Sequence, residues 1–471
     1  MNKKSLTFYD FCNENNFFIN INLISILLFI ISGCFSAISF LKSSLPLFAW
    51  IGIFILPFAF YSAKNIYFKI LGFSIFLIIY QFFGHPWYML SVYLASSEIL
   101  NIFETVFYSI FVIGILAWVI PPQIPFIFGL LVTENFIPEI LKKNNLKQAI
   151  IPLFIWFPCS YLLGEYFIFS FSGLSMGSWL YSQWNFLLVL KSVSNLGWNL
   201  TLIICLTIPL SLAESIIFKK TKYFYVSLIC ILILIIQPNL NNEIPKILYE
   251  IGSVYANNET FHPQKVDNKI KLLVWPEIAR SGRPKVHEGK VEGVKIRPPF
   301  KSKDVFHIIG QETRIQEGLQ NSVLALSPEG NILSVRAKKD LFPAVETPFY
   351  GFKFKEKFEY IAGDKISYLE FNNKKIISLL CFEQMDRCFV KELNKNNDID
   401  LITILARDTL LGGNPEIYEQ FTAMAVLLAV ENKIPIIRSS IDGPSAIISP
   451  NGMVLAISEP NKSGIILLGE K

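Results

Sequence analysis

The sequence predicts a membrane protein in two parts, an α-helical transmembrane bundle of about seven helices followed by a mixed α/β sandwich domain. Three observations support this fold class. The 471 residues are 52% hydrophobic, with a mean hydropathy of +0.45, which is too apolar for an ordinary soluble protein. Apolar runs long enough to cross ~30 Å of hydrocarbon fill the first half. After about residue 240, the runs shorten to the lengths typical of strands.

The first half contains about seven apolar stretches that are long enough to span a bilayer. The first one is longer than the apolar core of a signal peptide and has no small-residue cleavage site, so we interpret it as a retained helix. The fourth contains "PPQIP", which leaves open whether it is two pieces. The stretches lie near 17–41, 44–63, 69–84, 104–135, 148–171, 194–217 and 223–239.

Lysines between these stretches predict the orientation of the bundle. With a cytoplasmic N-terminus and seven crossings, only Lys42 and Lys191 fall on outer segments, and the other lysines lie on the inner side, as the positive-inside rule requires. We therefore expect a bacterial cytoplasmic (inner) membrane protein whose second half lies on the periplasmic side. The inner lysines are Lys3, Lys4, Lys64, Lys69, Lys142, Lys143, Lys147, Lys219, Lys220 and Lys222.

A polar, turn-rich segment separates the two parts. We place the transmembrane helical domain at 1–240, a linker at 241–268 and a second folded domain at 269–471. Short runs that are apolar on both faces, with a helix between them, predict a mixed α/β sandwich. The expected helix is 414–433, which starts with an Asn cap and a proline. The expected strands are 270–277, 321–339, 375–383, 400–408, 434–442 and 445–458, and two of these stretches are hairpins that turn at "PEGN" and "PNG".

Charge and ligand-forming residues exclude several classes of function. Residues 1–240 hold 12 Lys and 8 acidic residues, a net +4, and residues 241–471 hold 30 basic and 29 acidic residues, a net +1. A nucleic-acid-binding face on the soluble part is therefore not expected. The 4 histidines form no ligand pair and the 7 cysteines have no paired spacing, so we expect no metal and no cofactor.

Three predicted strands each end on a reactive side chain, namely Glu277, Lys338 and Cys381. Singly, each also fits a structural role: a turn cap for Glu277, a solvated surface lysine for Lys338, and buried filler for Cys381. Together they form a complete set for acyl transfer. A carboxylate can take the thiol proton, and an ammonium can lower the thiol pKa and stabilise an oxyanion.

These residues stand in motifs that resemble the nitrilase superfamily and, within it, the apolipoprotein N-acyltransferases. The resemblance covers most of residues 270–460. The motifs occur in the order "VWPE" ending at Glu277, "NS" beginning at Asn321, K-x-x-L-x-P-x-x-E from Lys338 to Glu346, C-x-E from Cys381 to Glu383, and E-x-x-x-P-x-x-R-x-x-x-x-G-x-S from Glu431 to Ser445.

The resemblance implies a nitrilase-type αββα sandwich and a set of residue roles. Glu277 would be the general base and acid, Lys338 the oxyanion stabiliser, and Cys381 the nucleophile that forms a thioester. Glu346 would orient Lys338 or the substrate, with Glu383 and Asn321 in supporting positions. Its partners would be the membrane, a phospholipid acyl donor and a lipoprotein acceptor whose N-terminal amine receives the acyl chain. Lys339 competes with Lys338, but the motif spacing favours Lys338.

Several departures from the family pattern keep alternatives open. Phe382 replaces the usual tyrosine after the nucleophile, "ARDTLLGG" lacks the tryptophan of the usual loop, "SGLSMGSWLYSQ" stands where Gly-Phe-Pro-Trp is expected, and no final transmembrane helix is predicted. These features favour, as the alternative, a TraB-like conjugal-transfer membrane protein with a nitrilase domain of unknown substrate. An inactive partner-binding module is a further alternative, but the retained Glu, Lys and Cys count against it. A transporter would need Glu165 or Glu214, neither of which forms a midplane pair.

Overall fold

The computed structural model describes residues 21–42, 44–63, 65–85, 120–135, 152–172, 178–257, 266–278, 284–287, 290–291, 296, 298, 300, 304–342, 346–347, 360–364, 367–411 and 414–468. The predicted membrane stretches extend beyond these ranges at 17–20, 104–119 and 148–151, and those parts of the prediction lie outside the described residues.

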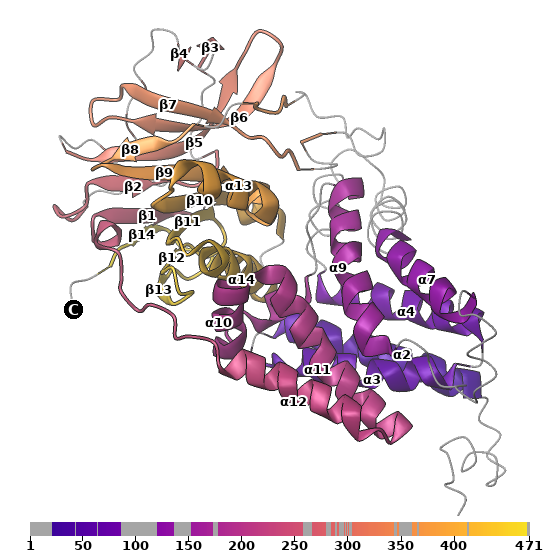
Figure 1. The fold of residues 1–471 in the computed structure, drawn as a ribbon. Helices are drawn as coiled ribbons and strands as arrows, with labels where there is room; N and C mark the ends of the chain where they lie inside the picture. The colour runs from indigo at the N-terminus through magenta and orange to yellow at the C-terminus, as the bar shows by residue number, and fades with distance from the viewer. Residues whose placement is uncertain are drawn as a thin grey trace, which may run out of the picture.

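The first part of the chain is helical (Figure 1). Three stretches in the described residues are long and apolar enough to cross a membrane, namely Asn22–Leu41, Ile66–Gly84 and Trp198–Phe218. The number of seven crossings stays a prediction. The helices are α2 (Ile21–Leu41), α3 (Leu47–Ser62), α4 (Ile66–Gly84), α7 (Ile120–Asn135), α9 (Leu153–Ser172), α10 (Leu187–Leu196), α11 (Trp198–Phe218) and α12 (Thr221–Ile235), with a short 3-10 helix, η2 (Trp179–Gln183).

Small residues let the first helices approach closely. A Cβ added at Gly52 of α3 would lie 2.2 Å from the Ser36 Oγ of α2, and the Ser32 hydroxyl donates to the Gly52 carbonyl at 2.7 Å. Such contacts are typical of helix pairs in membranes, where apolar burial does not distinguish a neighbouring helix from lipid and close packing must hold the pair together.

The second part is a sandwich of two six-stranded sheets. Sheet A has the order β14-β1-β2-β5-β6-β7, and sheet B has the order β13-β12-β11-β10-β9-β8. Sheet A consists of β1 (Ile251–Tyr255), β2 (Leu272–Val274), β5 (Phe306–Arg314), β6 (Leu319–Leu326), β7 (Ile332–Ala337) and β14 (Gly464–Ile466). Sheet B consists of β8 (Leu369–Phe371), β9 (Lys374–Leu380), β10 (Leu401–Arg407), β11 (Ile436–Ile441), β12 (Ala446–Ile448) and β13 (Val454–Ile457). A separate ribbon pairs β3 (Val286–His287) with β4 (Lys290–Val291).

The two sheets pack face to face over a shared apolar core. Leu272 and Ile308 of sheet A and Leu401 and Ile437 of sheet B belong to one buried cluster. Strands β9, β10 and β11 run parallel, so their carboxyl ends lie at the same edge. That edge is where side chains that follow these strands meet.

Helices α13 (Arg387–Asn397) and α14 (Pro415–Asn432) lie on the outer face of sheet B (Figure 1). The expected helix at 414–433 is thereby confirmed, with the Asn414 side chain capping it and Pro415 in its first turn. In the described part of the chain, helices cover only sheet B. The outer face of sheet A packs instead against residues such as Ile296 and Val305.

Helix α14 is buried between sheet B and the helical part. Its Gln420 side chain donates to the carbonyls of Phe40 at 3.2 Å and Gly84 at 2.9 Å, which stand at the carboxyl ends of α2 and α4. One continuous apolar cluster includes helical-part residues such as Phe29 and domain residues such as Ile404. The domain therefore rests on the helix ends through an apolar interface, with Gln420 satisfying carbonyls that no intrahelical donor reaches.

The structure extends the sandwich into the predicted linker. Strand β1, within 241–268, pairs in parallel with β2, with Ile251 opposite Leu272. We expected no strand there because the neighbouring residues are polar and turn-rich, but the five residues of β1 are apolar enough to be buried in a sheet. Most of helix α10 also lies outside the predicted stretches, since the stretch 194–217 overlaps only its end.

Candidate active site

Glu277 lies in the turn after β2, held by both sheets. Its backbone N–H donates to the Ala406 carbonyl of β10 at 3.4 Å, and the Gly310 N–H of β5 donates to the Pro276 carbonyl at 3.3 Å. A Cβ at Gly310 would lie 2.6 Å from the Glu277 Cα, so only glycine permits this approach. Ile278 has φ of 49°, a strained conformation for a β-branched residue. The turn is held in place by its surroundings.

Lys338 follows β7 and is buried. Its side chain is only 2% exposed, so the interpretation as a solvated surface lysine is wrong. The Lys338 N–H donates to the Asn321 carbonyl at 2.7 Å, and its carbonyl accepts from the Gly363 N–H at 2.7 Å. These backbone bonds direct the ammonium inward, toward the carboxylates of Glu277 and Glu346.

Cys381 follows β9 and opens a 3-10 helix, η4 (Cys381–Met385). It is half-buried, and its φ of 45° lies in the left-handed region, which non-glycine residues rarely adopt. This sharp bend presents the thiol at the strand tip. The Cys381 thiol lies close enough to Glu277 and Lys338 for their charges to shift its pKa, Glu277 upward and Lys338 downward.

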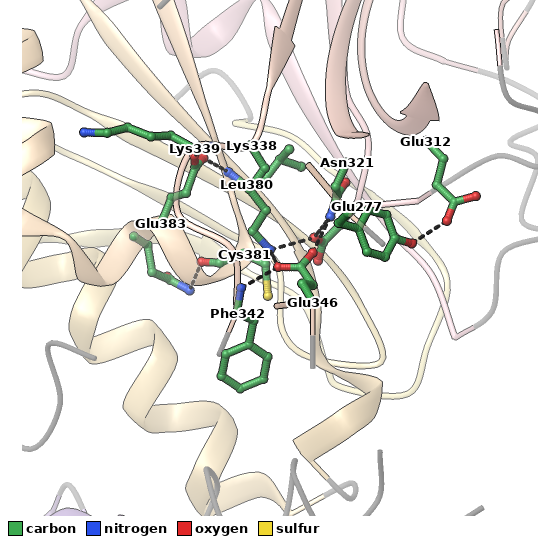
Figure 2. A network of polar contacts seen from close by, with 12 residues as sticks. Glu277, Glu312, Asn321, Lys338, Lys339, Phe342, Glu346, Leu380, Cys381 and Glu383 are labelled. Atoms are coloured by element: carbon green, nitrogen blue, oxygen red, sulfur yellow. Dashed lines mark hydrogen bonds and ion pairs between the residues drawn. The ribbon is translucent and has the colours of Figure 1, made fainter. Parts of the chain in front are cut away.

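The structure brings the three predicted reactive side chains together (Figure 2). The Lys338 Nζ lies 3.4 Å from the Glu277 Oε1 and 2.7 Å from the Glu346 Oε2. The Asn321 side-chain amide bridges the two carboxylates, donating to Glu277 at 2.7 Å and to Glu346 at 2.9 Å. The Lys338 ammonium and the Asn321 amide therefore each contact both carboxylates, and the Cys381 thiol lies beside them.

The electrostatics suit a proton transfer from sulfur to carboxylate. Burial raises the pKa of the Cys381 thiol, and the Glu277 carboxylate raises it further, so the thiol is protonated at rest. Burial also raises the pKa of Glu277, although Lys338 opposes this. Burial would lower the pKa of Lys338, but the carboxylates of Glu277 and Glu346 outweigh it, and the net shift is upward. Lys338 therefore stays charged, while Glu277 can exchange a proton.

Glu383 lies next to this group but serves a different purpose. Its carboxylate accepts two hydrogen bonds from the Arg336 guanidinium, both at 2.7 Å. It also accepts from the backbone N–H groups of Lys339 at 2.7 Å and Leu380 at 2.8 Å. We call Arg336 and Glu383 the clamp. Because Arg336 lies on sheet A and Glu383 follows a strand of sheet B, the clamp ties the Lys338 segment to the Cys381 segment.

A second buried ion pair supports the same edge of sheet B. The Arg438 guanidinium of β11 donates to both oxygens of Asp408, at 2.8 and 2.7 Å, and to the Pro444 carbonyl at 2.7 Å. Asp408 follows β10 and contributes to raising the pKa of the Cys381 thiol. A Cβ at Gly443 would lie 1.8 Å from the Asp408 Oδ2, so this glycine leaves room for the pair.

Two residues that support the candidate site, Asp408 and Arg336, could not be predicted from the motifs. The motifs singled out Arg438 but not its partner Asp408, and they gave no role to Arg336. A buried-strand arginine was the available signal, because arginine inside an apolar pattern requires an acidic partner. Lys339 points to the Phe389 ring, with its Nζ 4.2 Å from the ring centroid, and not to the carboxylates. Cys388 is exposed on α13.

Glu214, which a transporter would need, has a structural role in the helical part. Its carboxylate accepts from the Tyr61 hydroxyl and from the backbone N–H groups of Leu153 at 2.8 Å and Phe154 at 3.3 Å. It thereby caps the start of α9. Among the described residues, no cluster of His, Cys, Asp or Glu could hold a metal ion.

A family model and curated relatives match the second part of this chain. The carbon-nitrogen hydrolase family model matches residues 253–468. An apolipoprotein N-acyltransferase from Aquifex aeolicus is 28% identical over 211 residues, covering 43% of this chain and 46% of the relative. One from Geobacter metallireducens is 25% identical over 222 residues, covering 42% and 40%. The chain thus spans less than half the length of these curated relatives.

Solved structures of carbon-nitrogen hydrolases also match. A carbon-nitrogen hydrolase superfamily protein from Xanthomonas campestris is 16% identical, with a TM-score of 0.36, covering 46% of this chain and 89% of that protein. A nitrilase superfamily member from Saccharomyces cerevisiae is 13% identical, with a TM-score of 0.36, covering 47% and 91%. From the family model and the curated relatives, residues 253–468 of this chain form a carbon-nitrogen hydrolase domain that is distantly related to the apolipoprotein N-acyltransferases.

Proposed function

We propose that this chain is a membrane-embedded acyltransferase that carries the acyl group on Cys381. The observation that carries the proposal is the convergence of Cys381, Glu277 and Lys338 in a buried site, on a domain seated on apolar helix ends. The acyl donor is a phospholipid and the acceptor is the N-terminal amine of a lipoprotein. The relatives named apolipoprotein N-acyltransferases support this choice of substrates.

The first half-reaction forms a thioester. Glu277 takes the proton of the Cys381 thiol as the sulfur attacks an ester carbonyl of the phospholipid. The carbonyl oxygen becomes an oxyanion beside the Lys338 ammonium. When the carbonyl re-forms, the C–O bond breaks, and the departing alkoxide takes the proton from Glu277 and leaves as a lysophospholipid.

The second half-reaction reverses these roles. The acceptor amine attacks the thioester carbonyl and gives a proton to Glu277, and Lys338 again neutralises the oxyanion. Collapse breaks the C–S bond and leaves an amide, and the Cys381 thiolate recovers the proton from Glu277. The pair formed by Lys338 and Glu346 keeps the ammonium in place throughout, since it is the shorter of the two ion pairs of that lysine.

Helix directions support a position of the domain on the outer side of the membrane. The carboxyl ends of α2 and α4 contact the domain through Gln420. At the start of α11, the Trp198 ring lies 3.8 Å from the Arg387 guanidinium carbon of the domain. Lys69 at the start of α4 and Lys219 at the end of α11 lie at the opposite helix ends. This arrangement follows the positive-inside rule with the domain outside.

Amide hydrolysis is the second candidate, because the matching family model is that of carbon-nitrogen hydrolases. The two reactions share the thioester and differ in whether an amine or water removes the acyl group. The loop "ARDTLLGG", which lacks the tryptophan of the acyltransferase pattern, favours the further alternative of a TraB-like conjugal-transfer relative of unknown substrate.

The test is incubation of the purified protein with phospholipid carrying a labelled acyl chain. We expect label on the protein that hydroxylamine releases, in the wild type and in Cys388→Ala, but not in Cys381→Ala. Adding an amine-terminated lipopeptide should move the label to the peptide. No label in the wild type would refute phospholipid as the donor. Label released equally fast without the peptide would favour hydrolysis.

A further inference from the structure

A cavity of about 790 Å³ lies where the helical part meets the α/β domain, apart from the candidate active site. It is lined by the end of α10, residues 239–241 and 243–246, Lys433 and the turn 450–451. Lys433 precedes β11, and the turn joins β12 to β13, so the cavity is at the amino ends of the parallel strands of sheet B. Cys381 follows the carboxyl end of β9, at the other edge.

The walls of this cavity are held by amide hydrogen bonds. The Asn451 side chain donates to the Asn242 Oδ1 at 2.9 Å and so joins the domain to the segment after α12. The Asn195 side chain donates to the Lys191 carbonyl at 2.8 Å and to the Pro238 carbonyl at 3.4 Å, which joins that segment to α10. The cavity is thus bounded by three parts of the chain that are tied to one another.

Three charged side chains of the lining remain available to a ligand. Lys246, Lys433 and Glu243 are exposed, and none of them makes an ion pair or side-chain hydrogen bond with a described residue. Two ammonium groups suit a phosphodiester, because each can donate to its oxygens. One carboxylate suits an ammonium group. The set therefore complements a zwitterion that carries both groups.

Helix α12, which precedes the lining segment in the chain, has an exposed apolar surface. In the last turns of this helix, Leu232, Ile235 and Ile236 are 48%, 52% and 72% exposed. The chain then leaves the helix and enters the cavity wall at residue 239. A lipid with its head group in the cavity would lay its acyl chains along these side chains, which need an apolar partner.

We propose that this cavity binds the head group of a phospholipid with a primary ammonium, the phosphoethanolamine class. Lys246 and Lys433 contact the phosphate, and Glu243 accepts hydrogen bonds from the ammonium. A choline head group has no N–H to donate, and a glycerol head group has no cation for Glu243. The proposal rests on the membrane placement argued above but not on the chemistry of Cys381.

The test uses the full-length Cys381→Ala protein, so that no lipid is consumed. The protein in mild detergent receives an equal mixture of dioleoyl phosphatidylethanolamine, phosphatidylcholine and phosphatidylglycerol, and native mass spectrometry counts the lipid retained. We expect phosphatidylethanolamine to exceed phosphatidylcholine about tenfold, the ratio that corresponds to one charge-assisted hydrogen bond. If the wild-type protein retains phosphatidylethanolamine but forms no acyl-enzyme, the cavity binds lipid independently of the proposed reaction.

Matched variants identify the groups involved. Lys246→Gln with Lys433→Gln should lose most of the retained lipid, whereas Lys391→Gln with Lys395→Gln, on exposed positions of α13, should keep it. Glu243→Gln should reduce phosphatidylethanolamine to the level of phosphatidylcholine and leave phosphatidylglycerol unchanged. All five side chains are exposed, so folding should not depend on them.

Three results would overturn the proposal. Equal retention of the three lipids would remove the role of Glu243, and equal retention by the two double variants would remove the cavity as the site. Soluble glycerophosphoethanolamine serves as a competitor. Should it displace the lipid at equal concentration, the ligand would be a free phosphodiester, since the apolar face of α12 would then contribute nothing.

Discussion

Two buried pairs of a carboxylate and a cation lie side by side in the domain and differ in how fully the carboxylate is satisfied. Glu383 receives two bonds from Arg336 and two from backbone N–H groups. Glu277 accepts one hydrogen bond from the Asn321 amide, and its cation, Lys338, lies 3.4 Å away. Burial alone would raise the pKa of both carboxyl groups. Arg336 and the backbone donors reverse this for Glu383, whose pKa is lowered, while that of Glu277 remains raised.

The difference separates a structural charge from a reactive one. A carboxylate with four donors is held as an anion and cannot easily accept a proton. A carboxylate with too few donors, next to a protonated thiol, can accept one. Burial and the presence of a cation are common to both pairs, so neither feature alone identifies the catalytic group.

The largest effect is expected from removing the proton acceptor. Glu277→Gln keeps the shape of the site but cannot take the thiol proton, so alkylation of Cys381 by iodoacetamide at neutral pH should slow by about 10²–10⁴-fold. The thermal midpoint should not fall, because a buried, poorly solvated carboxylate is replaced by a neutral amide. Glu370→Gln, at an exposed position, is the control. An unchanged alkylation rate would remove Glu277 as the base.

Breaking the clamp should affect stability first. Arg336→Met leaves the Glu383 charge buried without its cation, which costs about 3–5 kcal/mol of unfolding free energy. Arg336→Met combined with Glu383→Leu removes both charges and should recover part of that loss. Denaturant unfolding of the detergent-solubilised protein measures both. If the double variant is as unstable as the single one, the loss does not come from an unpaired charge.

The two carboxylates should also respond to pH in opposite directions. The folded pKa of Glu383 is below its unfolded value of about 4.3, so its contribution to stability is complete above that pH and is lost as pH falls through the folded pKa. The folded pKa of Glu277 is raised, so its contribution is complete below the unfolded pKa and is lost as pH rises through the folded one.

Unfolding curves at a series of pH values test this difference. Glu383→Gln should lose less stability than the wild type on acidification, whereas Glu277→Gln should lose less as the pH rises above about 4.3. The alkylation rate of Cys381 should fall on acidification as Glu277 becomes protonated. Parallel pH profiles for the two variants would contradict the assignment of opposite shifts.

The smallest effect is expected from an exposed pair. Lys374 and Asp400 lie 2.8 Å apart, with side chains 50% and 29% exposed. Solvent screens this pair, so Lys374→Ala should change the unfolding free energy by only about 0–1 kcal/mol. The same denaturant measurement provides the comparison with the clamp. A loss as large as that of Arg336→Met would mean that burial is not what makes the clamp important.

Much of the fold and the site could be predicted from local patterns. The long apolar runs predicted the helical part, and short apolar runs predicted the strands that became β2, β6, β7 and β9 to β13. Motif order predicted Glu277, Lys338 and Cys381 as a set, and the structure brings their side chains together, while their catalytic roles stay predictions. Strand β1 was missed because it is only five residues long, contains a serine, and is flanked by polar residues.

By itself the sequence determined which residues end the strands, which segments are apolar enough to be helices beside lipid, and which reactive groups the chain possesses. Only the tertiary structure decided that Arg336 pairs with Glu383, that Gln420 reaches the ends of α2 and α4, and that Glu277 lacks enough donors to be held as an anion. The physical reason is the separation along the chain of the residues that interact. Helix and strand patterns arise between residues a few positions apart, whereas ionisation depends on side chains that only sheet packing brings together.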